Sequence, residues 1–176
     1  MVRYDARFCF LDLDENGLKD SELKILKRLR AIDSDDERQL IRRDGEWNSI
    51  RVQQYLHEKK RFLELLMLLF HLTGGQPGRS WKVGSIKFRN TQNAKRNFYV
   101  MNGKAFFYTE YHKARSTLYV SYHIVRYLSR RVRELVVLYL AYVCPFANLL
   151  YNQKLVKRNE FDGDYIFCFD ETNDRA

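Results

Sequence analysis

The chain has 176 residues, of which 45% are hydrophobic and 15% aromatic, and it carries a net charge of +9. This length suits one domain, and the aromatic content excludes a disordered chain. Its three cysteines, Cys9, Cys144 and Cys168, are too few and too widely spaced for a disulfide framework or a zinc site. The N-terminus lacks the apolar stretch of a signal peptide, so we expect an intracellular protein with free, buried thiols.

The charge is distributed unevenly along the chain. Residues 1–48 hold 10 basic and 12 acidic side chains, residues 49–133 hold 17 and 3, and residues 134–176 hold 4 and 7. A basic middle between acidic ends is typical of a surface that binds a polyanion. Nucleic acid is the polyanion we expect. The alternatives are an anionic membrane, an acidic protein, or a lysine-rich surface with no partner.

The N-terminal part predicts two short helices. Apolar residues recur at helical spacing over residues 18–31, as in an amphipathic helix. Residues 34–37 then place acids where a helix start favours them, which predicts a second helix to about Arg43. Residues 12–17 imitate the start of a calcium-binding loop, but Leu23 stands where the loop needs a glutamate. We therefore expect a turn and no metal site.

A long helix follows, from the capping position at Asn48 to Leu72. Its apolar residues keep helical spacing over about six turns. Gly74 and Gly75 are expected to end it, and residues 76–78 to extend the turn before a new helix near Arg79. The apolar surroundings of His71 in the sequence predict a core histidine whose hydrogen bonds are satisfied.

The pattern between residues 87 and 125 is strand-like. Residues 97–101 and 104–109 are rich in aromatic side chains and are joined by Asn102 and Gly103, the strongest short signal for a β-hairpin. A third strand is expected within residues 118–125. Together with the helices, these strands predict an α+β fold that is mainly helical, with helices around a small antiparallel sheet on the basic side.

The last predicted helix is the most apolar. Ser129 is expected to cap a helix from Arg130 to about Val143, which Pro145 breaks before opening a final helix through Leu150. The apolar run at 135–151 reaches the lower length limit for crossing a membrane. Its proline and Asn148 favour a buried helix instead, so we expect no membrane contact. Beyond residue 160 the acidic chain predicts a strand or disorder.

Basic side chains interleaved with aromatic ones form the strongest candidate site. Lys and Arg neutralise phosphates and release counterions, and Arg binds a phosphate through two hydrogen bonds. We expect most of the aromatic residues to be core and a minority to stack on bases. No nucleotide-binding glycine motif or serine-hydrolase motif is present, so no cofactor is expected. The residues predicted to bind the DNA backbone are Lys82, Lys87, Arg89, Lys95, Arg96, Lys104 and Arg115.

Residues 47–150 also resemble a region of large fungal proteins related to telomere-linked RecQ-like helicases and their mobile-element neighbours. The resemblance is carried by residues 52–56, 71–77, 89–91, 96–97, 111–113, 126–128 and 145–146. That region in turn looks like the first half of a crypton-like tyrosine recombinase catalytic core. The resemblance implies a nuclear protein, and a partial recombinase fold with an acidic helical lead-in at 1–46, the basic core at 47–151 and an acidic tail at 152–176.

By this resemblance, two residues would be remnants of a catalytic site. Arg79 would be the first catalytic arginine, which holds the scissile phosphate, and Lys113 would be the hairpin lysine that protonates the leaving hydroxyl. The chain departs from the family pattern at Lys82 and Val83, which replace Glu and Leu. The residues after Phe146 contain no histidine and so lack the His-x-x-Arg segment.

Three functions follow from these observations. The first is a truncated recombinase-like core that binds DNA without performing strand transfer. The second is one piece of a larger, active recombinase or helicase polypeptide. The third is a non-enzymatic interaction module whose basic face meets an acidic protein.

Overall fold

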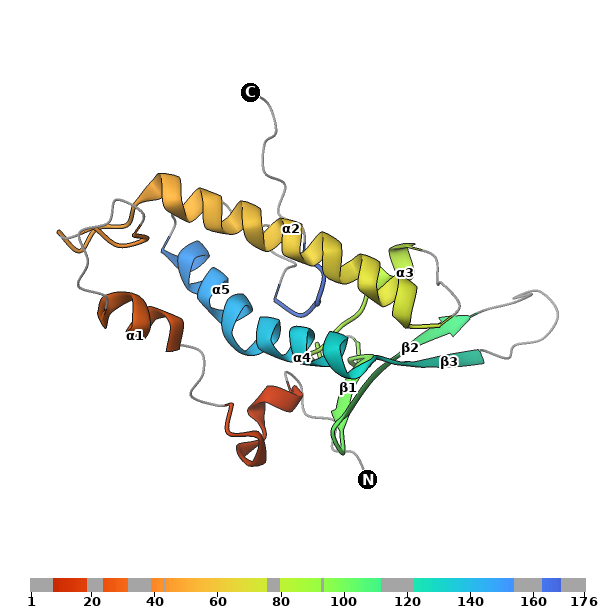
Figure 1. The fold of residues 1–176 in the computed structure, drawn as a ribbon. Helices are drawn as coiled ribbons and strands as arrows, with labels where there is room; N and C mark the ends of the chain where they lie inside the picture. Colours follow the sequence, from red (N-terminus) through yellow and green to blue (C-terminus); the bar gives the residue numbers. More distant parts are fainter. Residues whose placement is uncertain are drawn as a thin grey trace.

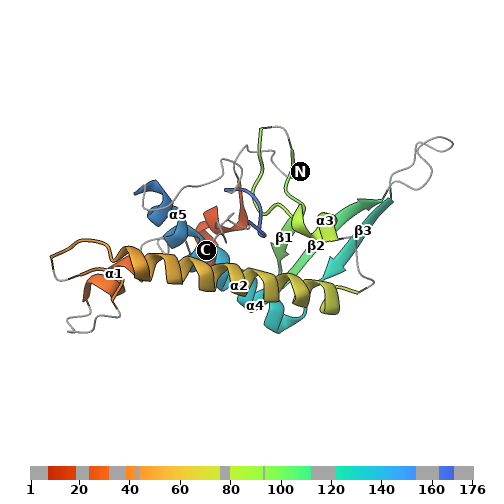
Figure 2. The same cartoon turned by 90° about the horizontal axis from the view of Figure 1, so that it is seen from above.

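The computed structural model describes residues 8–18, 24–31, 39–42, 44–75, 80–92, 94–111, 122–153 and 163–168. Two long helical segments lie side by side, and a three-stranded antiparallel sheet closes one end of the pair (Figures 1 and 2). The α+β fold class is therefore confirmed. The elements are α1 (Lys24–Ala31), α2 (Ser49–Thr73), α3 (Ser80–Gly84), β1 (Phe98–Met101), β2 (Lys104–Tyr111), β3 (Tyr122–Tyr127), α4 (Arg130–Leu138), a π-helical turn (Tyr139–Val143) and α5 (Cys144–Asn152), preceded by two 3-10 turns (Phe10–Asp12 and Asp14–Asn16).

Helix α2 begins and ends where its sequence predicts. The side chain of Asn48 accepts a hydrogen bond from the Arg51 N–H at 3.4 Å and so caps the first turn. At the other end, the Gly74 N–H donates to the Phe70 carbonyl, and Gly75 has a φ of 84°. This left-handed conformation is the one that glycine supplies at helix ends, and it directs the chain away from the helix axis.

The sheet is built on the predicted hairpin. Asn102 and Gly103 have φ angles of 48° and 68°, as a type I′ turn requires. Tyr99 pairs with Phe106 across β1 and β2, and Phe106 pairs with Tyr127 across β2 and β3. The third strand occupies Tyr122–Tyr127 and so extends beyond the predicted end at residue 125, while residues 118–121 of that prediction lie outside the described part of the chain.

The hydrophobic core has two clusters, and α2 passes through both. The larger cluster joins the C-terminal half of α2 to α4 and the inner face of the sheet; its fully buried members include Leu63, Leu66, Phe70, Phe98, Phe107 and Val136. The smaller cluster joins the N-terminal half of α2 to α5 through Val52, Leu56, Phe146, Ala147 and Leu150, and partly buried side chains of α1 pack against it. The sheet therefore packs against only one half of the helical pair.

The predicted helix break at Pro145 is wrong. Helix α4 begins at the predicted Ser129 cap, whose Oγ accepts from the Val132 N–H, and helical structure then continues through the π-helical turn into α5. In that turn the Cys144 N–H donates to the carbonyl of Tyr139, five residues back. Proline removes a helical hydrogen bond and crowds the preceding turn. The wider turn just before Pro145 provides the space that an α-helical turn does not.

The continuous helix Arg130–Asn152 has 23 residues and a mean hydropathy of 1.6 over its most apolar window, which is long and apolar enough to cross a membrane. A core helix of a soluble protein meets the same criterion. In this fold 44% of the window is buried, and its buried side chains belong to both core clusters.

The second predicted N-terminal helix is wrong over residues 39–42. There Ile41 forms a β-bridge with Trp47, and the Arg42 N–H donates to the Glu46 carbonyl at 2.8 Å. Asp44 and Gly45 make the turn between them, so the local turn chemistry overrides the helical pattern. The predicted helix start at 34–37 lies outside the described residues. The amphipathic helix before it is confirmed over Lys24–Ala31.

Both acidic ends of the chain contribute to the larger core cluster. Cys9 and Phe10 are buried in it, as are Ile166 and Phe167. The C-terminal segment is also bonded to the loop between α3 and β1, since the Ile166 N–H donates to the Ile86 carbonyl at 2.9 Å. The predicted boundaries at residues 46 and 152 thus separate segments that pack together.

We predict that the Phe107→Ala variant loses about 3–5 kcal/mol of unfolding free energy, because this ring is buried and stacked on Phe70. Urea denaturation followed by circular dichroism measures the loss. Tyr127→Ala, on the opposite face of the same sheet, is the control and is expected to cost less than about 1 kcal/mol. Similar losses for the two variants would contradict the assignment of the inner face.

Candidate nucleic-acid interface

Three of the predicted DNA-binding residues converge on one cavity of about 380 Å³. Lys82 comes from α3, whereas Lys87 and Lys95 come from the loop between α3 and β1. The rest of the lining is formed by Ser85, Ala94, Asn97, Tyr108, Thr109 and Glu110. We call this cavity the lysine pocket.

The loop that carries Lys87 and Lys95 is fixed to the sheet by backbone hydrogen bonds. Asn97 accepts from the Lys87 N–H at 2.7 Å through Oδ1 and donates to the Tyr108 carbonyl at 3.1 Å through Nδ2. A turn closed between Thr91 and Ala94, with two bonds of 2.9 Å, precedes Lys95. These hydrogen bonds constrain the backbone on either side of the two lysines, and such pre-organisation reduces the entropic cost of binding a ligand.

The charge of the lysine pocket is strongly positive. Glu110 is the one carboxylate among its described lining residues, and its side chain lies 3.2 Å from the Nε2 atom of His123. Lys82 donates its Nζ proton to the backbone carbonyl of Glu110. Lys87 lies 5.0 Å from the centre of the Tyr165 ring. Three lysines thus face one glutamate, an arrangement that attracts an anion.

Arg96 was predicted to bind the DNA backbone, and the structure corrects this. Its side chain is only 8% exposed, and its guanidinium lies 4.7 Å from the ring centre of Phe8 and 4.9 Å from that of Tyr99. Cation–π contacts on both sides make Arg96 a structural cation that joins the N-terminal segment to the sheet.

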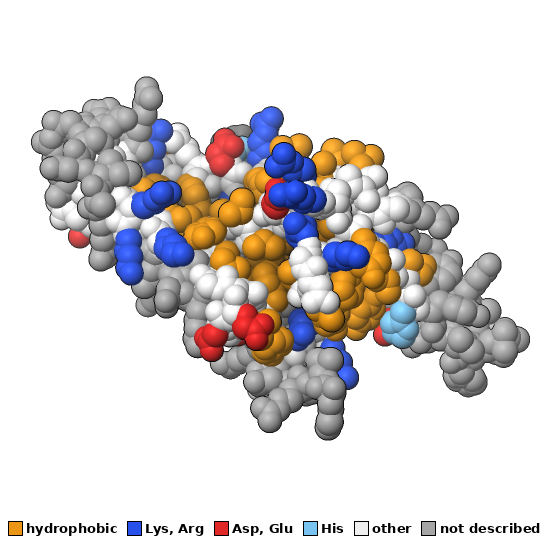
Figure 3. Space-filling view, turned by 60° about the horizontal axis from the view of Figure 1, so that its bottom comes forward, with side chains coloured by type: hydrophobic (Ala, Val, Ile, Leu, Met, Phe, Trp, Pro, Cys, Tyr) orange, Lys and Arg blue, Asp and Glu red, His pale blue; other side chains and the backbone are white. Residues whose placement is uncertain are grey.

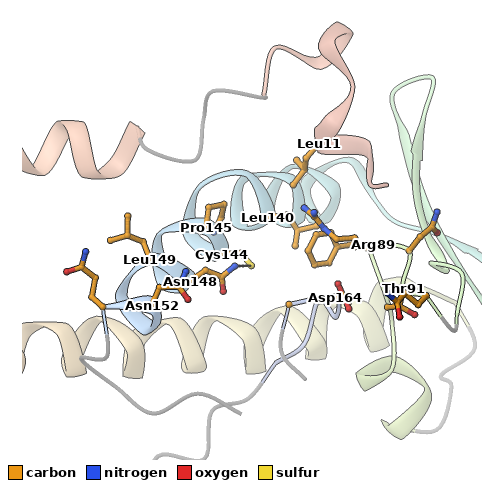
Figure 4. A pocket seen from close by; sticks show the side chains of 15 residues that line it. Leu11, Arg89, Thr91, Leu140, Cys144, Pro145, Asn148, Leu149, Asn152 and Asp164 are labelled. Atoms are coloured by element: carbon orange, nitrogen blue, oxygen red, sulfur yellow. Dashed lines mark hydrogen bonds between the residues drawn. The ribbon is translucent and has the colours of Figure 1, made fainter. Parts of the chain in front are cut away.

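Arg89 lies on the other side of the same loop, in a larger cavity of about 770 Å³. Figure 4 shows this cavity between the loop and the helix that contains Leu140 and Pro145. The guanidinium of Arg89 donates to the Cys9 Sγ atom at 3.6 Å. Its half-buried side chain is therefore separated from the lysine pocket.

The remaining predicted residues divide into two groups. Lys104 is exposed beside the hairpin turn, four positions along β2 from Tyr108 and thus roughly 13 Å from the nearest strand residue of the lysine pocket by strand geometry. Arg79, Lys113 and Arg115 lie outside the described residues. The structure therefore brings together Lys82, Lys87 and Lys95 of the predicted set.

Ser85, Asn97 and the outward-facing rings of the sheet are parts of the site that were not predicted. Asn97 is the first residue of the predicted strand and directly precedes β1 in the structure, a position where a side chain that bonds the backbone is common. The two-residue alternation of the hairpin strands assigns Tyr99, Phe106 and Tyr108 to one face, and this signal is present in the sequence.

His71 is not the satisfied core histidine that its sequence predicts. The side chain is half-buried, and its Nδ1 atom is inaccessible to water without a hydrogen-bond partner among the described residues. Over the described ranges no group of three or more His, Cys, Asp or Glu side chains is placed to hold a metal ion. Residues 12–17, which are predicted to form a turn, lie in two 3-10 turns, and Asp12 there accepts from the Cys9 N–H at 2.7 Å.

No protein-family model matches the chain, and no solved structure is significantly similar to it.

The thiol of Cys9 titrates abnormally. Its side chain is fully buried, and burial raises the pKa to about 11 from an ordinary value of 9.0, although the nearby Arg89 opposes the shift. The unfolded chain therefore releases this proton at a lower pH than the folded chain does. Ionisation of the unfolded state then favours unfolding as the pH rises.

We predict that Cys9 lowers the unfolding free energy by about 1.4 kcal/mol per pH unit between pH 9 and pH 11, and has no such effect below pH 8. Urea denaturation of the natural protein and of Cys9→Ala across this range isolates the contribution. A constant difference between the two proteins from pH 8 to pH 11 would show that the thiol is not perturbed.

Proposed function

We propose that this chain binds DNA through its phosphate backbone at the lysine pocket and does not perform strand transfer by itself. The observation that supports the proposal most directly is the convergence of Lys82, Lys87 and Lys95 on one cavity that contains a single described carboxylate. Phosphates bind such sites through charge and counterion release, without a requirement for base sequence.

The resemblance to a tyrosine recombinase core adds two further residues to the proposed DNA contact. In that interpretation Arg79 and Lys113 would lie near the bound phosphate as remnants of a catalytic pair. Strand transfer also needs a second arginine and a tyrosine nucleophile in the motif that follows. The residues after Phe146 have no histidine and hence no such motif. DNA binding without chemistry is the function that these residues support.

The lysine pocket is tested by its salt dependence. We predict that Lys82→Ala/Lys87→Ala/Lys95→Ala weakens duplex binding and lowers the slope of log affinity against log salt by about 0.9 for each phosphate that is no longer neutralised, or roughly 2–3 in all. Fluorescence anisotropy with a labelled duplex at several potassium chloride concentrations measures both quantities.

The matched control removes the same charge elsewhere. Lys27→Ala/Arg28→Ala/Arg61→Ala changes three exposed cations on α1 and α2, away from the sheet, and is expected to leave the slope nearly unchanged. Equal effects of the two triple variants would mean that net charge, not the lysine pocket, governs binding. Absence of DNA binding by the natural protein at low salt would end the proposal. A polyacidic peptide that displaces bound DNA in competition would instead favour an acidic protein partner.

The recombinase resemblance has a separate test. Arg79→Ala is expected to weaken duplex binding about fivefold or more, because arginine is the residue that binds a phosphate through two hydrogen bonds. Arg79→Lys keeps the charge but not the paired bonds and is expected to restore binding only partly. Unchanged affinity in Arg79→Ala, with an unchanged melting curve, would remove Arg79 from the DNA contact.

A further inference from the structure

The sheet exposes aromatic and apolar side chains on the face that points away from the core. The inner face is covered, since Phe98, Ala105, Phe107 and Thr109 are each at most 6% exposed. On the outer face Tyr127 is 60%, Met101 58% and Val125 48% exposed. An antiparallel sheet with one covered face ordinarily presents polar side chains on the other. The apolar character of this outer face therefore points to a ligand that covers it.

The rings of the outer face form a continuous row across all three strands. Tyr127 contacts Phe106 with ring centres 5.4 Å apart, and Phe106 stacks on Tyr99 at 5.4 Å with planes 15° apart. Tyr99 in turn lies 6.1 Å from Tyr108, which meets His123 edge to face at 5.4 Å. We call these five residues the aromatic row.

The aromatic row borders the lysine pocket. Tyr108 is a member of the row and also lines the pocket beside Lys82, Lys87 and Lys95. Burial and the neighbouring Tyr99 raise the pKa of Tyr108. Figure 3 shows a face of the molecule on which hydrophobic side chains lie next to Lys and Arg, with a histidine at the edge. Rings and cations therefore form one surface.

We propose that this surface binds single-stranded DNA, with unstacked bases on the aromatic row and phosphates in the lysine pocket. The inference rests on the proposed function and names the form of DNA that the site takes. Duplex DNA hides the faces of its bases, so the aromatic row gives it nothing to stack on. A single strand exposes base faces and carries the same phosphates, and sites for it combine a basic groove with aromatic platforms.

Tyr127 is the main stacking platform in this arrangement. Tyr99 and Phe106 face each other and have their neighbours on both sides, which leaves little ring surface for a base. Tyr127 stands at the end of the row on β3, an edge strand of the described sheet, and Phe106 is the ring that it contacts there. One side of the Tyr127 ring is thus open to a base.

The proposal is tested by comparing a labelled oligothymidine with a labelled duplex of the same length in anisotropy titrations. Tyr127→Ala is expected to weaken binding of the single strand roughly tenfold, the effect of removing one stacked base, and to change duplex binding less than about twofold. Tyr127→Phe keeps the ring and should bind normally. Tyr127→Leu keeps the apolar area but removes the ring, and should behave as Tyr127→Ala does.

Ile50→Ala is the control, since Ile50 is 64% exposed on α2 far from the sheet, and both affinities should remain unchanged. Equal binding of the single strand by the natural protein and Tyr127→Ala would overturn the proposal, while a duplex affinity that still depends on the lysines would leave the proposed function standing. Failure of both DNA forms to bind would end both. A dimer that sedimentation detects in the natural protein and not in Tyr127→Ala would instead assign the face to a second copy of the chain.

Discussion

The packing of Phe70 joins helix α2 to the sheet and to the C-terminal segment. This ring, near the end of α2, lies 5.4 Å from Phe107 of the inner face and 5.1 Å from Phe167 of the C-terminal segment, and all three are buried. Gly74, at the end of this helix, has no room for a side chain, since a Cβ there would lie 2.6 Å from the Phe70 carbonyl oxygen. Because one face of the sheet is used in this contact, the other is left to solvent. Helix α3 and its loop then follow beside it and bring the lysines to its edge.

Much of this arrangement was predictable because its signals are local. A capping asparagine, two glycines at a helix end and an Asn-Gly turn act through their own backbone within a few residues, so α2 and the hairpin follow from the sequence. The basic loop was also predictable from charge. Lys82, Lys87 and Lys95 were among the predicted residues, although the sequence does not show that they line one cavity.

The features that could not be predicted depend on contacts between distant segments. Arg96 has the composition of a DNA-binding residue, and only the folded chain brings Phe8 and Tyr99 to its two sides. Ile166 and Phe167 are in an acidic tail, yet they are buried in the larger cluster, where the Ile166 N–H donates to the Ile86 carbonyl. The acidic side chains of a segment predict that it is exposed to solvent. Whether its apolar residues are buried depends on the surface that the rest of the folded chain offers them.

The π-helical turn before Pro145 has a consequence for the spacing of the core. Val136, Leu140 and Cys144 are buried at intervals of four residues, and in a regular α-helix each such step rotates a side chain about 40° beyond the last. The wide turn absorbs this drift and so keeps the buried side of the helix facing α2 along its whole length. The π-helical turn adds one residue to the helix, just before Pro145, where the proline ring needs space. The buried side of the helix therefore keeps its direction beyond the turn. One helix can then pack into both hydrophobic clusters, whereas in a regular α-helix the buried side would have rotated away.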